Sequence, residues 1–401
     1  MHTTAVLHKL LKNSAPSIHA IRLTALMDAV RALTHGAQVS ITSLGRHLQG
    51  HTFDKHKIKR MDRLIANPHL FRERLLIYKA LTTTILNGLA EPIIVVDWSP
   101  LCADQRWHLL RAAVPVGGRS LTLYEEVHPR SKLGNRRVQH QFLLTLAGLL
   151  PSGSTPIVVA DSGFKTPFFR YIEQALGWHW VGRIRGQDVL RYSAECPWFS
   201  AKSLYSRARK TPRIVGAVDW TRGNAFSAWI VLAGQIKKQR TSNRLDGSRR
   251  NCKRSRTHAN REREPWLLVA SHSLGGRTAK QIQTIYRTRM QIEEGFRDCK
   301  SVHYGLGLSQ HARTHKHRRT LLCLLAALAT FVLWCIGVAG KTSPLVRCVR
   351  VNSSSQREPY SVIFLARLLI AQPGFRVSES EFKCSLRQIE IYSREVLNSW
   401  G

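Results

Sequence analysis

Acidic residues are scarce in this sequence. Its 401 residues include only 25 Asp and Glu against 61 Lys and Arg, which gives a formal net charge of +36. Such an excess of positive charge indicates a polyanionic partner, above all a nucleic acid, because basic chains bind phosphates with release of counterions. A ribosome-like structural protein and a membrane-surface protein are the alternatives. The scarcity also means that a carboxylate inside an apolar strand needs a specific reason.

Paired cysteines are lacking as well. None of the eight Cys residues forms a CxxC motif, and their spacing suits neither a zinc site nor a disulfide framework. We therefore expect reduced thiols in a cytoplasmic protein. The N-terminus lacks the positive-then-apolar pattern of a signal peptide, and no internal repeat is present.

Long hydrophobic runs are limited to one segment, residues 320–340, which is apolar enough for a membrane span. The alternative is a helix buried on all sides inside a large domain. Basic residues continue on both sides of the segment, in regions that would then face opposite compartments. We therefore expect a buried helix and no membrane.

Residues 1–88 are expected to form a helical DNA-binding domain. Apolar side chains recur at helical spacing over residues 17–33, a short helix is predicted over residues 41–48, and a basic segment covers residues 55–65. A short helix, a turn and a basic helix are compatible with a helix-turn-helix motif. The alternative is the solvated basic face of an ordinary helical bundle.

Two continuous apolar runs each end in an aspartate. Residues 93–96 precede Asp97, and residues 156–160 precede Asp161. Such runs indicate buried strands. A carboxylate there is costly unless it is paired or binds a metal, and polar groups gather around ligands at the strand ends of an α/β sheet. The alternative is an Asp that merely begins a turn.

The segments between and after these runs complete an α/β pattern. Further strands are predicted over residues 109–116, 120–127 and 179–185, and helices over residues 138–150 and 166–176. The order strand, strand, strand, helix, strand, helix, strand predicts an α/β core that carries the two aspartates.

The expected domains follow from these patterns. A β-rich insertion interrupts the core, and its basic tract, residues 237–263, has almost no apolar side chains. Helices with Pro and Ser breaks form a C-terminal tail. The expected boundaries are residues 1–88 for the helical DNA-binding domain, 89–185 for the first part of the core, 186–263 for the insertion, 264–340 for the second part of the core and 341–401 for the C-terminal helical region.

A helix predicted over residues 278–300 supplies a third acid. Four of its residues have offsets of 0, 3, 7 and 14 positions and share one face at about 3.6 residues per turn: Tyr286, Arg289, Glu293 and Lys300. Glu293 can complete a carboxylate metal site, and Arg289 and Lys300 can bind phosphates. Tyr286 can donate a hydrogen bond to a phosphate oxygen. The alternative is an amphipathic helix with an incidental Arg–Glu pair.

Residues 286–300 match a Tyr-x2-Arg-x3-Glu-x6-Lys signature at every signature position. The strand ends at Asp97-Trp98 and at Asp161-Ser162-Gly163-Phe164 supply two further acid motifs in the matching order. Together these motifs resemble those of the insertion-sequence-four family of bacterial cut-and-paste transposases. Tyr124-Glu125 and residues 304–308 add to the similarity.

The resemblance implies a ribonuclease H-like catalytic core with a β-rich insertion. It also implies that Asp97, Asp161 and Glu293 are the catalytic residues and the metal ligands of a DDE triad. The reaction would be two-metal phosphoryl transfer with two Mg²⁺ ions, or Mn²⁺ in their place. In relatives, a hairpin forms at the transposon end before strand transfer into target DNA.

Trp266 stands where the family places a tryptophan that holds a flipped base during hairpin formation. Met290 occupies the position of a second tryptophan that some relatives carry. For Trp266 the alternative is a core indole on a strand. Lys165 closely follows the second acid and is a candidate phosphate contact. His128 and His140 are expected to be surface or core groups.

The expected partner is double-stranded DNA, both as transposon-end inverted repeats and as target. A homodimer on DNA is expected because cutting two ends in concert needs two active sites. The family also implies a cytoplasmic, nucleoid-associated bacterial protein. Three alternatives remain: an inactive or domesticated relative that binds DNA without cutting, a ribonuclease H-like nuclease without strand transfer, and a basic membrane-associated protein.

Overall fold

The computed structural model describes residues 3–234, 252, 257, 264–310, 314–351 and 359–398. The basic tract predicted over residues 237–263 lies outside the described residues, apart from 252 and 257. The chain divides into two compact units, and each is built from segments far apart in the sequence. Unit one contains Met1–Ser154 and Met290–Arg394, and unit two contains Thr155–Arg289 and Glu395–Gly401.

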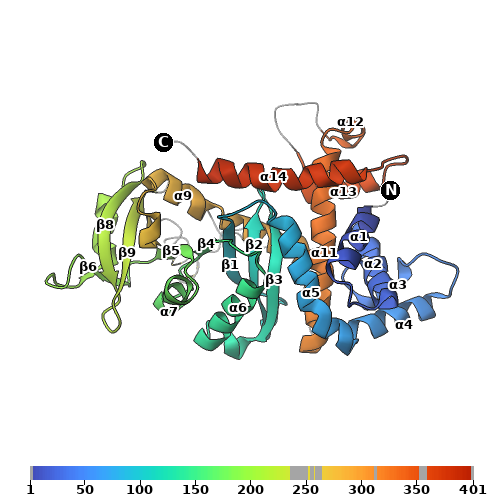
Figure 1. The fold of residues 1–401 in the computed structure, drawn as a ribbon, viewed down its shortest axis with the longest axis horizontal. Helices are drawn as coiled ribbons and strands as arrows, with labels where there is room; N and C mark the ends of the chain where they lie inside the picture. The colour runs from blue at the N-terminus through green and yellow to red at the C-terminus, as the bar shows by residue number, and fades with distance from the viewer. Residues whose placement is uncertain are drawn as a thin grey trace. The chain divides into compact units, whose positions relative to one another are not determined.

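Helices alone form the described part of unit one before its first strand (Figure 1), which confirms the helical prediction for this region. Ser40 Oγ accepts the N–H of Ser43 at the start of α3, and Asn67 caps α5 by accepting the N–H of Leu70. The helices are α1 (Thr3–Ser14), α2 (Ala20–Thr34), α3 (Ile41–Arg46), α4 (Asp54–Ile65) and α5 (Pro68–Ile85).

Helices α3 and α4 cross closely at Gly45. A Cβ atom at this position would lie 2.6 Å from the Cα of Ile58, so only glycine allows the approach. Together, α3 and α4 give the predicted succession of short helix, turn and basic helix. Beyond its first residue, α4 exposes only basic side chains to solvent: Lys55, His56, Lys59, Arg60 and Arg63.

Three antiparallel strands follow, in the order β3-β2-β1. The first four residues of β1 are at most 1% exposed, as their apolar run predicts. The turn between β2 and β3 contains Gly117 and Gly118 at φ 76° and 86°, a conformation that favours glycine. The strands are β1 (Ile93–Pro100), β2 (Trp107–Pro115) and β3 (Ser120–Pro129).

Helices cover both faces of these strands. On one face, Phe142 of α6 (Arg136–Leu149) stacks on Tyr124 of β3, with ring centroids 5.1 Å apart. On the other face lies α10 (Met290–Lys300), which contacts all three strands. Three further helices follow later in the chain: α12 (Val346–Val349), α13 (Val362–Ile370) and α14 (Glu379–Leu397).

The long apolar helix α11 (Lys316–Gly340) is the core of unit one. It packs against α2, α13 and β3 (Figure 1), and 94% of its apolar stretch is buried inside the protein. The expectation of a buried helix is confirmed. All eight Cys residues are free in the structure.

Unit two contains a second set of strands, in the order β4-β5-β10-β9-β8-β6-β7. β4 pairs with β5 in parallel, and β5 pairs with β10 antiparallel. The strands are β4 (Ile157–Ala160), β5 (His179–Ile184), β6 (Val189–Arg191), β7 (Phe199–Ser200), β8 (Arg213–Trp220), β9 (Phe226–Ala233) and β10 (Trp266–Ala270). The helices are α7 (Thr166–Arg170), which continues as the π-helical turn Tyr171–Ala175, and α9 (Ala279–Arg287).

The prediction of one helix over residues 278–300 is wrong, because α9 and α10 are separate helices. The backbone N–H groups of Thr288 and Arg289 donate to the carbonyl oxygens of Ile285 and Tyr286, at 3.2 and 3.1 Å. The Thr288 hydroxyl also donates to the Ile285 carbonyl, at 2.7 Å. Bonds to a residue three positions back tighten the turn beyond α-helical geometry and end α9.

The break changes the expected face of the four signature residues. Glu293 and Lys300 still share a face on α10, in unit one. Tyr286 and Arg289 belong to unit two and do not lie on one continuous helix with them.

Candidate active site

A cleft with a volume of about 510 Å³ is present in unit one. Its walls come from the end of β1 and from α10, and two predicted carboxylates and one predicted lysine meet there. Glu293, Arg297 and Lys300 follow one another by four and three residues, the spacing that places side chains on one side of a helix. The lining residues are Asp97, Trp98, Ser99, Glu293, Phe296, Arg297, Lys300 and Ser301.

The two carboxylates of the cleft are accessible. Asp97 is half-buried and stands where β1 leaves the fully buried core. Its Oδ1 accepts the backbone N–H of Trp98 at 2.8 Å, which orients the carboxylate. Glu293 is exposed in the first turn of α10. Both groups can therefore reach a ligand in the cleft.

Lys300 ties α10 to the end of β1. Its Nζ donates to Ser99 Oγ at 2.6 Å and to the carbonyl oxygen of Pro100 at 3.1 Å. Desolvation lowers the pKa of Lys300 and nearby Arg111 lowers it further, whereas Asp97 acts in the opposite direction. The cleft thus places basic side chains beside two carboxylates, a composition that can hold a phosphodiester next to a metal site.

A buried ion pair lies under the same helix. Arg111 Nε and Glu125 Oε2 are 2.7 Å apart, and both side chains are 1% exposed. Tyr78 donates its hydroxyl to Glu125 Oε1 at 3.4 Å, and the Arg111 guanidinium lies 4.8 Å from the ring centroid of Phe296. Burial raises the pKa of Glu125, against the opposing effect of Arg111. A compensated pair of charges therefore lies against Phe296, one of the residues that line the cleft.

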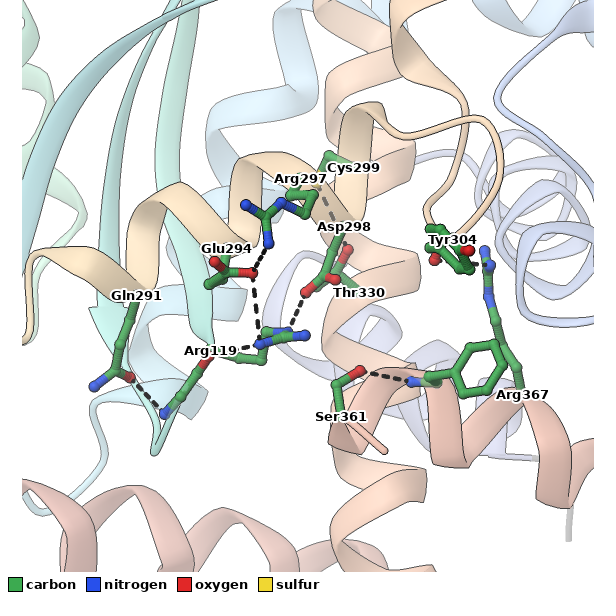
Figure 2. A network of polar contacts seen from close by, with 12 residues as sticks. Arg119, Gln291, Glu294, Arg297, Asp298, Cys299, Tyr304, Thr330, Ser361 and Arg367 are labelled. Atoms are coloured by element: carbon green, nitrogen blue, oxygen red, sulfur yellow. Dashed lines mark hydrogen bonds and ion pairs between the residues drawn. The ribbon is translucent and has the colours of Figure 1, made fainter. Parts of the chain in front are cut away.

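Another side of α10 is fastened to the turn between β2 and β3 (Figure 2). Gln291 Oε1 accepts the backbone N–H groups of Val116 and Gly118, at 3.0 and 3.1 Å. Arg119 Nε lies 2.6 Å from Asp298 Oδ2. These contacts fix the orientation of the helix that carries Glu293 and Lys300.

Asp161 belongs to unit two, directly after β4. It is half-buried, and its Oδ1 accepts the backbone N–H of Gly163 at 2.8 Å. Lys165 is exposed and donates to the carbonyl oxygen of Ser162 at 3.2 Å. Arg185 also reaches this turn, donating from Nε to Ser162 Oγ at 3.0 Å. The second predicted acid therefore lies in an ordered turn with basic side chains close by.

Three further predicted residues also belong to unit two. Trp266 begins β10 and is half-buried, and its ring makes a T-shaped contact with the ring of Tyr286, with centroids 5.1 Å apart. Tyr286 is only 3% exposed, and desolvation raises its pKa. Arg289 is half-buried in the break after α9. Tyr286 therefore packs against Trp266 as a buried group.

Asp97 and Glu293 are the residues of unit one that could hold a metal. A hard cation such as Mg²⁺ takes one or two protein carboxylates and completes its shell with water and phosphate oxygens, which suits an open cleft with two carboxylates. Across the described ranges, no group of three or more His, Cys, Asp or Glu side chains that could hold a metal ion is present. Water and phosphate oxygens could complete the shell of an ion held by these two carboxylates.

Sequence reasoning missed Ser99 and Arg297, which line the cleft, and the pair Arg111–Glu125 beneath it. Arg111 left a signal, because a charged residue inside an apolar strand needs a buried partner. The expectation for His128 is confirmed: it is 8% exposed, with Nε2 2.6 Å from Glu126 Oε2. His140 is half-buried on α6.

Comparison with known proteins identifies the family of this chain. No curated protein matches the sequence. The family model of the transposase DDE domain matches residues 89–331, more than half of the chain, and this region contains the cleft residues and Asp161. The chain therefore belongs to the family of DDE-domain transposases, which are DNA-cleaving enzymes that bind DNA.

Proposed function

We propose that the protein is a cut-and-paste transposase that binds transposon ends, cleaves them and inserts them into target DNA. The observation that carries the proposal is the meeting of Asp97, Glu293 and Lys300 in one cleft within the transposase DDE domain. Two carboxylates with a lysine beside them suit cleavage of a phosphodiester better than simple DNA binding.

In this proposal Asp97, Asp161 and Glu293 form the catalytic triad and hold two Mg²⁺ ions, or Mn²⁺ in their place. When bound, such ions activate the attacking hydroxyl and stabilise the leaving oxygen. Lys300 binds a phosphate oxygen beside the scissile bond. Because Ser99 and the Pro100 carbonyl already hold its ammonium group, the charge is in position before DNA arrives.

The predicted residues of unit two are proposed to bind the transposon end. Lys165 and Arg289 would contact phosphates, and Trp266 would hold a flipped base while a hairpin forms. Tyr286 is buried against Trp266, so we propose that it supports the indole and does not contact phosphate directly.

We further propose membership of the insertion-sequence-four family, with close similarity to the transposase of insertion sequence ten. The Tyr-x2-Arg-x3-Glu-x6-Lys motif over residues 286–300 supports this assignment. The basic face of α4 is proposed to bind end DNA, since its exposed side chains suit phosphate contacts. The working form would be a homodimer on DNA, in the cytoplasm and associated with the nucleoid.

Replacement of Glu293 tests the site. On supercoiled plasmid that carries the inverted repeats flanking the coding region, Glu293→Gln should abolish Mg²⁺-dependent cutting. End binding in a gel-shift assay should remain, because the fold and the basic face of α4 are unchanged. Glu294→Gln, one position away and outside the cleft lining, is the matched control and should still cut.

Each outcome of this assay has a meaning. Cutting by Glu293→Gln would refute the site assignment. Wild-type cutting without integrated product would identify a nuclease without strand transfer. Binding without any wild-type cutting would identify an inactive relative.

A further inference from the structure

A row of three charged residues crosses β1, β2 and β3 on one face. Asp97 pairs with Arg111 in the β1–β2 ladder, and Arg111 pairs with Glu125 in the β2–β3 ladder. Directly opposed residues of antiparallel strands point to the same face, with Cβ atoms about 4.5–5.5 Å apart. Arg111 therefore has a carboxylate neighbour on each side, and its guanidinium pairs with Glu125 at 2.7 Å.

Several contacts hold the Arg111 guanidinium beneath α10, where it is directed towards Glu125. Arg111 Nη2 donates to Cys299 Sγ at 3.5 Å, and the guanidinium lies against the ring of Phe296. Tyr78 steadies Glu125 by donating to its second oxygen. Because a buried charge without a partner is strongly unfavourable, Arg111 needs an anion. If Glu125 were neutral, the carboxylate adjacent to Arg111 in the same row would be that of Asp97.

We propose that Glu125 is a positioning residue that holds Arg111 away from Asp97 and thereby keeps the Asp97 carboxylate available to a divalent cation. The inference rests on the proposed function, in which Asp97 is a metal ligand. A carboxylate that pairs with arginine offers fewer lone pairs and less negative charge to a cation. The role is asymmetric: loss of Glu125 weakens metal binding, whereas loss of Arg111 does not.

Binding of Mn²⁺ to the full-length protein tests this role without any need for cleavage. Titration followed by electron paramagnetic resonance gives the affinity for four variants: Asp97→Asn, Glu125→Gln, Arg111→Met and the double variant Arg111→Met/Glu125→Gln. We expect Glu125→Gln to weaken Mn²⁺ binding by about tenfold or more, as replacement of a residue that orients a metal ligand does. Arg111→Met and the double variant should bind nearly as tightly as wild type.

An ion pair that only stabilises the fold would give equal losses in the two single variants, and that result would overturn the proposal. A double variant that binds no better than Glu125→Gln would also overturn it. If Glu125→Gln does not fold, as judged by circular dichroism, the neutral double variant decides. Near-wild-type affinity then supports the proposal, and a loss as large as that of Asp97→Asn contradicts it.

The same titration separates this proposal from the proposed function. Wild-type Mn²⁺ binding that is unaffected by Asp97→Asn would refute Asp97 as a ligand, and the role of Glu125 with it. Binding that depends on Asp97 but shows no difference between Glu125→Gln and Arg111→Met would refute the role of Glu125 alone.

Discussion

Charged side chains around α10 differ mainly in their burial. Arg111 and Glu125 are 1% exposed and compensate each other, whereas Glu293 is exposed in the cleft. Asp97 and Glu293 could be predicted from a strand end and a sequence signature. The pair Arg111–Glu125 could not, because its partners lie on different strands and only the sheet register brings them together.

Asp298 gives a pH effect with a defined sign. Burial raises its pKa to about 6, although Arg119 lies 2.6 Å away. A carboxyl group with a higher pKa in the folded state binds more protons there, so its contribution to the free energy of unfolding falls as pH rises from about 4 to about 6. Two pKa units correspond to about 3 kcal/mol, which is an upper value for a side chain in partial contact with solvent.

In Asp298→Asn this contribution is absent. Between pH 4 and pH 7, we expect the free energy of unfolding to fall less than in wild type, by up to about 3 kcal/mol. Urea unfolding followed by circular dichroism at both pH values measures the difference. Parallel pH profiles of the free energy of unfolding for the two proteins would contradict a raised pKa of Asp298.

Strands and helices were predictable to different degrees. The strands before Asp97 and Asp161 are continuous apolar runs, and the structure places β1 and β4 there. The break between α9 and α10 was missed because apolar spacing continues through it. At the break, the backbone N–H and the buried hydroxyl of Thr288 both donate to the Ile285 carbonyl, a local arrangement that periodicity does not record.

Replacement of two glycines by alanine should change the free energy of unfolding in opposite directions, because only one of them lies at the crossing of α3 and α4. Gly45→Ala places a Cβ 2.6 Å from the backbone of Ile58. Such overpacking costs about 1–3 kcal/mol and should exceed the gain of about 1 kcal/mol that alanine gives in a helix. Gly148→Ala in α6 is the matched control, because nothing lies within 4 Å of its added Cβ. It should raise the free energy of unfolding by up to about 1 kcal/mol.

Thermal or urea unfolding of both variants measures these effects. Gly45→Ala should also weaken DNA binding if α4 is displaced from α3. A rise in the free energy of unfolding for both variants would show that the α3–α4 crossing is less tight than the structure gives.

Whole-molecule properties follow from composition only in part. The net charge of +36 indicated a polyanionic partner, in agreement with a DNA-cleaving family. The burial of α11 followed from the basic segments on both sides of it. The division into two units could not be predicted, because unit one joins segments that are separated by the whole of Thr155–Arg289.

Salt dependence tests how this charge is used. Each phosphate contact removed should reduce the slope of log affinity against log salt concentration by about 1. We therefore expect the double variant Lys55→Ala/Lys59→Ala to lose about 2 from the slope for end DNA. Fluorescence anisotropy at several KCl concentrations measures the slope.

The matched control replaces two exposed lysines outside α4, Lys12→Ala/Lys341→Ala. It removes the same net charge and should leave the slope near the wild-type value. Equal slopes for the two double variants would mean that only total charge matters and that α4 has no special role.

The discontinuous build of unit one has a consequence for synthesis. Translation delivers Asp97 and strands β1 to β3 early, but Glu293, Lys300 and the core helix α11 emerge only in the last third of the chain. Because the N-terminal part of a chain leaves the ribosome first, the nascent protein carries its basic helices long before it has a cleft. A chain interrupted before Met290 lacks both the cleft wall that α10 forms and the core helix α11. Unfinished copies therefore lack the cleft in which we propose that DNA is cut.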